Sequence, residues 1–284
     1  MRQFTFYSLA VATLFMLAEC TLSGANAQVA LEKTPHTPTL FLIGDSTVKV
    51  GTKGQMGWGE QIGKYFDGTK IKVDNRARGG RSSRTFFTEG LWEATLKEMK
   101  AGDFVMMQFG HNDGGANYTG DRGRSSLKGN GDETRAITHA DGKTETVHSY
   151  GWYLRQYVAD AKAKGATPIV LSPIPRNRRG ENGKVFRSGT NDYGQWAREA
   201  AQAEKVAFID LNAIVADQYD ALGKEKVDPL FGGDWTHTNP EGADLNARAV
   251  IAGLKGLENH PLSSYLATST QDIAADVAAM NAIK

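Results

Sequence analysis

Five short apolar runs alternate with stretches of helical spacing along this chain. The runs are rich in Val, Ile, Leu, Phe and Met without strict alternation, which is typical of strands covered on both faces. We predict strands at Thr39–Asp45, Ile71–Ala77, Asp103–Gly110, Thr167–Pro173 and Val206–Leu211. Strands that alternate with helices predict a mostly parallel sheet with helices on both faces.

Helix signals fill most of the intervals between these strands. Tyr150–Lys164 places apolar residues at helical spacing and meets Gly165, a typical C-terminal glycine. Asn239 and Pro240 supply an N-cap and a first-position proline to a helix that we expect to run through Leu257. Further helices are expected at Trp92–Lys100 and Asn191–Lys205.

Two segments depart from this alternation. Residues 111–149 are Gly-rich and charged and follow directly on the third strand. Connections of this length are usually functional loops or disordered, and this position favours an insertion that covers a site. Residues 269–284 are Ala-rich and predict a peripheral helix.

The N-terminus has the pattern of a secretory signal. Arg2 precedes an apolar stretch over residues 9–18 that is too short to span a membrane, and residues 25–27 form an A-x-A cleavage site. We therefore expect residues 1–27 to be a signal peptide and 28–284 to be a single exported domain, periplasmic or extracellular. A lipid anchor at Cys20 is the alternative, although Glu19 stands where that motif has a small residue.

The composition of the 284 residues is that of an ordinary globular protein, with 40% hydrophobic and 23% charged residues. The net charge is +1, so no global field favours nucleic acid or a membrane surface. We expect neither a nucleic-acid partner nor membrane attachment after signal cleavage.

Small polar clusters follow three of the predicted strands, and a fourth precedes the last helix. They cover residues 44–46 (GDS), 78–83 (RGGRSS), 110–113 (GHND) and 234–237 (DWTH). Each alone could be an ordinary turn. In an open α/β sheet the carboxyl ends of the strands border one crevice, so we expect the clusters to converge there.

The residue types in these clusters favour nucleophilic catalysis. A serine hydroxyl needs an adjacent base, which a third group must orient. Asp234 lies three residues before His237, so a tight turn can bring its carboxylate to one imidazole nitrogen and leave the other for Ser46. The backbone N–H groups of Ser46 and Gly80 and the side-chain amide of Asn112 could donate to an oxyanion.

The four clusters resemble, in this order, the four blocks of the SGNH (GDSL-like) hydrolase superfamily. Ser46, Gly80, Asn112 and His237 fall on the block-defining positions and Asp234 on the third triad position. The stretches GDSTV, GRSSRTF, QFGHND and DWTHTNPEGA are more similar still to rhamnogalacturonan acetylesterases, over about residues 39–257. The resemblance implies a flavodoxin-like, three-layer α/β/α sandwich, a Ser-His-Asp triad, no cofactor and an acetylated polysaccharide substrate. The Ala-rich tail and the length of the 111–149 segment depart from it.

Arginine is concentrated near the predicted crevice. Guanidinium groups bind carboxylates in a fork, and indole rings could stack on sugars, whereas a solvated charged surface is the alternative. The candidate substrate-binding residues are Arg81, Arg84, Trp152, Arg176 and Trp235. They favour an acetylated acidic polysaccharide or oligosaccharide, such as pectic rhamnogalacturonan.

Two alternatives remain. The same triad could act on acetyl-xylan, a lipid ester or another acyl substrate. The fold could instead serve a non-catalytic carbohydrate-binding protein, although no triad or oxyanion residue is missing from the sequence.

No metal site is expected. Several potential ligands in the long insertion lack a recognised ligand spacing, namely His111, Asp113, His139, Asp141 and His148. The carboxylates of this segment could still bind a cation.

Overall fold

The computed structural model describes residues 1, 36–189 and 191–276. Apart from Met1, the predicted signal peptide lies outside these ranges, as does the segment 277–284 of the predicted tail helix. No helix in the described part of the chain combines the length and apolarity needed to cross a bilayer.

All five predicted strands are present and form one parallel sheet in the order β2-β1-β3-β6-β7. Their bounds are β1 Thr39–Gly44, β2 Lys72–Asn75, β3 Phe104–Gln108, β6 Thr167–Leu171 and β7 Ala207–Ile209. This is the flavodoxin-like order, in which the winding direction reverses between β1 and β3. The predicted fold class is confirmed, and the reversal lies where the clusters that contain Ser46 and Asn112 begin.

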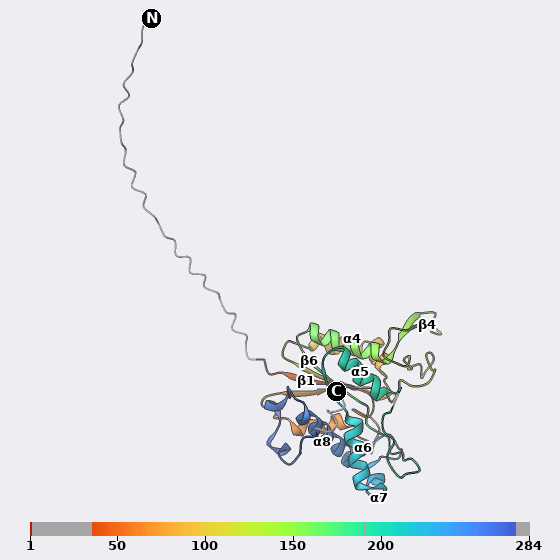
Figure 1. Cartoon of the computed structure of the whole chain (residues 1–284). Helices are drawn as coiled ribbons and strands as arrows, with labels where there is room; N and C mark the ends of the chain where they lie inside the picture. Colours follow the sequence, from red (N-terminus) through yellow and green to blue (C-terminus); the bar gives the residue numbers. More distant parts are fainter. Residues whose placement is uncertain (2–35, 190, 277–284) are drawn as a thin grey trace. The chain divides into compact units, whose positions relative to one another are not determined.

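Alternate strand residues pack into two separate cores, one on each face of the sheet. Leu40 and Leu42 of β1 belong to one core, and Phe41 and Ile43 belong to the other. The first core includes α1 (Trp58–Gln61), α6 (Leu211–Leu222) and α8 (Pro240–Gly256), and the second includes α3 (Leu91–Glu98), α4 (Tyr150–Ala163) and α5 (Tyr193–Ala203). Figure 1 shows α4 and α5 on one side of the strands and α6 and α8 on the other.

The four predicted helices correspond to α3, α4, α5 and α8. At the start of α8, the Asn239 side chain accepts a hydrogen bond from the Gly242 N–H at 2.9 Å, and Pro240 opens the helix. The shorter helical segments are α2 (Ser83–Thr88), α7 (Lys224–Val227), η1 (Ile62–Tyr65), η2 (Asp228–Leu230), η3 (Ser263–Tyr265) and η4 (Thr268–Thr270). Residues 271–276 contain no α-helix, so the described part of the predicted tail helix is limited to η4.

The sequence analysis missed α6. The predicted last strand was extended to Leu211, whereas β7 ends at Ile209 and the Asp210 side chain accepts a hydrogen bond from the Ala213 N–H as the N-cap of α6. Because apolar residues lie on both sides of Asp210, the pattern of apolar positions does not mark the boundary between β7 and α6.

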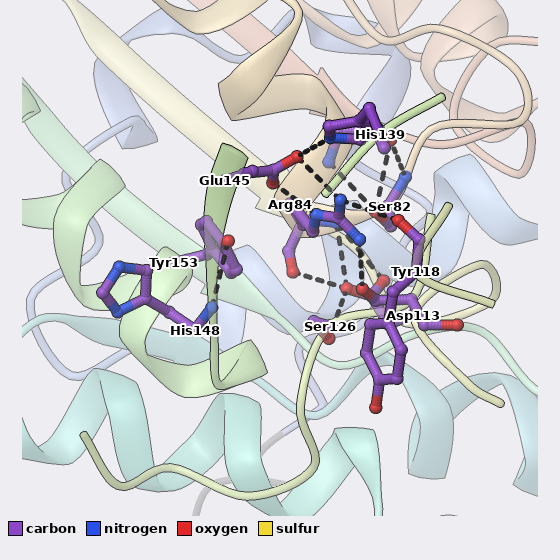
Figure 2. A network of polar contacts seen from close by, with 12 residues as sticks. Ser82, Arg84, Asp113, Tyr118, Ser126, His139, Glu145, His148 and Tyr153 are labelled. Carbon is purple, nitrogen blue, oxygen red and sulfur yellow. Dashed lines mark hydrogen bonds and ion pairs between the residues drawn. The ribbon is translucent and has the colours of Figure 1, made fainter. Parts of the chain in front are cut away.

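The insertion at residues 111–149 contains an antiparallel hairpin of β4 (Thr134–Thr138) and β5 (Thr144–His148). A polar network ties it to α2 (Figure 2). The guanidinium of Arg84 donates to both carboxylate oxygens of Glu145, at 2.6 and 2.8 Å, and to the carbonyl oxygens of Ser125 and Tyr118. The insertion is therefore held in place by side chains from the sheet-and-helix scaffold.

Candidate active site

Ser46 lies in the turn directly after β1, and a buried network fixes that turn. The Asp45 carboxylate accepts hydrogen bonds from the backbone N–H of Thr47 at 2.9 Å and from its hydroxyl at 2.7 Å. The Gln108 side chain of β3 donates to the Thr47 hydroxyl at 2.5 Å and accepts from the Trp58 indole at 2.9 Å. Two adjacent strands and α1 thus hold the backbone that presents Ser46.

The structure brings Ser46, His237 and Asp234 into one hydrogen-bonded chain. Ser46 Oγ lies 2.8 Å from His237 Nε2, and His237 Nδ1 lies 2.7 Å from Asp234 Oδ2. With Nδ1 donating to the carboxylate, Nε2 is the acceptor that faces the serine hydroxyl. This is the geometry that a serine nucleophile, its base and an orienting carboxylate require.

A tight turn before α8 supplies both the carboxylate and the imidazole. Asp234 Oδ1 accepts from the backbone N–H groups of Thr236 at 2.6 Å and His237 at 2.7 Å, and Gln55 donates to Oδ2 at 3.2 Å. Burial acts to raise the pKa of Asp234, but the bonds from His237 and Thr236 outweigh it and lower the pKa to about 2. The carboxylate is therefore ionised near neutral pH.

The three possible oxyanion donors, the N–H groups of Ser46 and Gly80 and the Asn112 amide, belong to residues that line one pocket. Gly80 has a φ of +78°, a left-handed conformation that favours glycine. The Asn112 amide donates one hydrogen bond to the Arg81 carbonyl oxygen at 2.9 Å, which orients the amide and leaves its second N–H for a ligand. Within residues 36–189 and 191–276, the N–H groups of Ser46 and Gly80 bond to no other backbone group.

The pocket around Ser46 is open, polar and about 990 Å³ in volume. Three of the predicted substrate-binding residues line it: Arg81, Arg176 and Trp235. Arg81 is paired with Glu89 at 2.8 Å. Trp235 is 59% exposed, and the Arg178 guanidinium lies 5.9 Å from its ring centroid. Much of its indole is therefore exposed in the pocket lining.

The structure does not bring Arg84 and Trp152 to the pocket with the other predicted substrate-binding residues. Arg84 is 1% exposed and holds Glu145 of the insertion, because the first turn of α2 points its side chain beneath the insertion. The Trp152 ring stacks on His148, with centroids 3.7 Å apart and planes at 13°. Neither side chain lines the pocket.

Sequence reasoning missed several pocket residues. Gln55 bonds to Asp234, and Arg122 and Arg124 of the insertion line the pocket. His111 also lines it; burial lowers the pKa of its imidazole to about 4, so the ring is neutral near pH 7. The arginines and His111 lie in the segment expected to cover the site, and His111 also belongs to the predicted 110–113 cluster, whereas Gln55 carried no signal.

The potential metal ligands of the insertion do not converge. His139 is hydrogen bonded to Glu145 at 2.8 Å, and His148 stacks on Trp152. Among the residues that the structure describes, no group of three or more His, Cys, Asp or Glu side chains could hold a metal ion.

The sequence of this chain is similar to a known protein family and to several known proteins. Residues 42–245 match the model of the GDSL-like lipase/acylhydrolase family. The chain is 36% identical to the rhamnogalacturonan acetylesterase of Emericella nidulans over 80% of this chain and 89% of that protein. It is 34% identical to a Bacillus subtilis protein named a probable rhamnogalacturonan acetylesterase, over 77% of this chain and 93% of the relative.

Solved structures show the same fold. The crystal structure of the Bacillus subtilis protein YxiM superposes with a TM-score of 0.62 at 29% identity, over 78% of this chain and 56% of that longer one. An acetylxylan esterase of Geobacillus stearothermophilus superposes with a TM-score of 0.51 at 18% identity, over 75% of this chain and 92% of the esterase.

Proposed function

Because this chain belongs to the GDSL-like lipase/acylhydrolase family of ester hydrolases, we propose that it removes acetyl groups from pectic rhamnogalacturonan. The observation that carries the proposal is the unbroken contact from Ser46 through His237 to Asp234 beside a polar pocket with cationic side chains. The two relatives at 36% and 34% identity, whose names state this activity, support the choice of substrate.

In the acylation step, Ser46 Oγ attacks the acetyl carbonyl carbon while His237 Nε2 takes the hydroxyl proton. The resulting oxyanion accepts hydrogen bonds from the backbone N–H groups of Ser46 and Gly80 and from the Asn112 amide. His237 then gives its proton to the departing sugar oxygen, which leaves as a free hydroxyl. An acetyl group remains on Ser46.

Deacylation repeats these steps with water. His237 takes a proton from the water as its oxygen attacks the acetyl-Ser46 carbonyl, and returns it to Ser46 Oγ as acetate leaves. Asp234 stays ionised, holds the imidazole tautomer and stabilises the imidazolium formed in each half-reaction.

Two observations bear on the alternatives. A lipid substrate needs an apolar acyl groove, whereas the pocket lining contains Arg81, Arg122, Arg124 and Arg176. The triad contact favours catalysis over a purely carbohydrate-binding role. Acetyl-xylan remains the second candidate substrate, since the acetylxylan esterase shares the fold.

We also propose that the protein is exported to the periplasm or the medium, with residues 1–27 removed. The basic, apolar and A-x-A regions of the N-terminus support this. Mass spectrometry of the mature protein should show Gln28 as its first residue, and an unprocessed N-terminus would contradict the proposal.

The function is tested by acetate release. The protein should release acetate from acetylated rhamnogalacturonan faster than from acetylated xylan, and Ser46→Ala should lower kcat roughly 10⁴-fold or more without unfolding the protein. Ser264→Ala, at an exposed serine outside the pocket, is the matched control. Near-native activity of Ser46→Ala would exclude the mechanism, and a preference for xylan would exclude the substrate.

A further inference from the structure

The insertion brings two arginines into the pocket that contains Ser46. Arg122 is exposed and Arg124 is half-buried, and both line the pocket. Arg81 and Arg84 are paired with Glu89 and Glu145. In the described part of the chain, by contrast, Arg122 and Arg124 form no ion pair.

Arg124 lies against one of the expected oxyanion donors. Its Nη1 donates to the carbonyl oxygen of Gly80 at 3.3 Å, so the guanidinium lies beside the reacting centre. Burial lowers the pKa of Arg124 and the positive charge of Arg122 lowers it further, which together outweigh the opposite effect of the buried carboxyls of Asp113 and Asp45. The positive charges of Arg122 and Arg124 repel each other, and Arg124 is partly desolvated. An anion bound between them would offset this repulsion.

The pocket supplies few anions for this purpose. Its carboxylates are those of Glu89, Asp121 and Asp234. Glu89 is bound to Arg81 and Asp234 to His237, which leaves Asp121 as the remaining carboxylate in the lining. The guanidinium groups of Arg122, Arg124 and Arg176 are in the same lining. The lining therefore has an excess of positive charge that a bound anion would neutralise.

The backbone that carries Arg124 is anchored immediately after it. Ser125 donates its N–H to the Asn117 carbonyl and accepts from Arg84 through its own carbonyl oxygen. Ser126 bonds to buried Asp113 through its N–H at 3.1 Å and its hydroxyl at 3.0 Å (Figure 2). An arginine on an anchored backbone loses less conformational freedom when a ligand binds than one on a free loop. Its contacts therefore contribute more to affinity.

We propose that Arg122 and Arg124 bind the carboxylate of a uronic acid residue in the acetylated glycan, and so set a preference for acidic over neutral glycans. The planar guanidinium of Arg124 matches a carboxylate in a two-point contact, and Arg122 adds a second positive charge. The inference rests on the proposed esterase function and assigns its substrate selectivity to the insertion.

The first test compares wild type with Arg124→Gln on acetylated rhamnogalacturonan oligosaccharides and on acetylated xylo-oligosaccharides. Loss of one charge-assisted contact should lower kcat/KM for the acidic substrate roughly 10- to 100-fold, mainly through KM, and lower it much less for the neutral substrate. Arg135→Gln is the matched control, because Arg135 is an exposed arginine of the same insertion that packs on Tyr118 outside the pocket. An equal loss on both substrates, or no loss on either, overturns the inference.

A second measurement separates this inference from the proposed function. Oligogalacturonate should inhibit cleavage of para-nitrophenyl acetate by wild type, and Arg122→Gln/Arg124→Gln should raise the inhibition constant at least tenfold. Neutral xylo-oligosaccharide should show no such difference. If wild type releases no acetate from rhamnogalacturonan, the proposed function fails while this inhibition still decides the inference. Equal inhibition constants for the two proteins would overturn it.

Discussion

Arg84→Met tests whether the buried guanidinium holds the insertion or serves the substrate. Methionine replaces the aliphatic part of the arginine side chain but has no hydrogen-bond donor. The substitution removes two bonds to Glu145 and two to the carbonyl oxygens of Ser125 and Tyr118. Glu145 keeps only its bond to His139 at 2.8 Å, with a side chain that is 19% exposed. A largely buried carboxylate is then left without its main cation.

The expected cost follows from this burial. Breaking one side of a buried ion pair costs about 3–5 kcal/mol of unfolding free energy, because the remaining charge stays desolvated. In a domain of this size that corresponds to a fall in Tm of roughly 6–20 °C. Burial acts to raise the pKa of Glu145, but the bonds from Arg84 and His139 outweigh it and lower the pKa, so removal of Arg84 should raise that pKa. Arg84→Met/Glu145→Met should regain part of the lost stability, since it leaves no unpaired charge.

Urea unfolding measured by fluorescence gives the free energies, and Arg76→Met is the control. Arg76 pairs with Asp74 and Glu98 closer to the surface, where an ion pair is worth about 1 kcal/mol or less. A loss of unfolding free energy below 1 kcal/mol for Arg84→Met, combined with a raised KM for the acidic substrate alone, would refute the structural role. It would indicate that Arg84 binds the substrate.

Three further predictions concern the reacting groups. Asp234→Asn should lower kcat roughly 10⁴-fold with little change in KM, measured on para-nitrophenyl acetate, because an amide holds the wrong imidazole tautomer; a loss below tenfold would contradict it. The folded pKa of Asp234, about 2 against an ordinary 3.8, means that its contribution to stability is present above pH 4 and is lost as the pH falls toward 2. Wild type should therefore lose more Tm than Asp234→Asn over that range, and parallel losses would disprove the linkage. Gly80→Ala and Gly90→Ala, at φ of +78° and +76°, should each cost about 1 kcal/mol of stability, but only Gly80→Ala should lower kcat; equal kcat values would exclude an oxyanion role for Gly80.

The sheet and its main helices were predictable because their signals are local. The five apolar runs needed no partner to be recognised, and the Asn239 cap with Pro240 marked the start of α8 correctly. The proximity of Ser46 and His237 was predictable from the topology, because the strand ends of a doubly wound sheet border one crevice.

The failures concern residues whose role depends on distant contacts. Arg81 and Arg84 lie three residues apart in the sequence. Arg84 pairs with Glu145 below the insertion, whereas Arg81 pairs with Glu89 in the pocket. The β4–β5 hairpin pairs only with itself among the described strands and is mostly exposed, so it carries no apolar periodicity. No local pattern distinguishes these cases from a solvated polar loop.

The turn that carries Asp234 and His237 is closed by hydrogen bonds within it, with Gln55 as an outside contact to Asp234. Its two N–H bonds to Asp234 Oδ1 keep carboxylate and imidazole at a fixed spacing, whereas the contact from His237 to Ser46 joins segments 191 residues apart. Small rearrangements of the molecule will therefore change the distance from His237 to Ser46 more than the distance from His237 to Asp234. Mild heating should inactivate the enzyme before the sheet unfolds. Cooling should restore the activity, because the hydrogen bond between Asp234 and His237 persists.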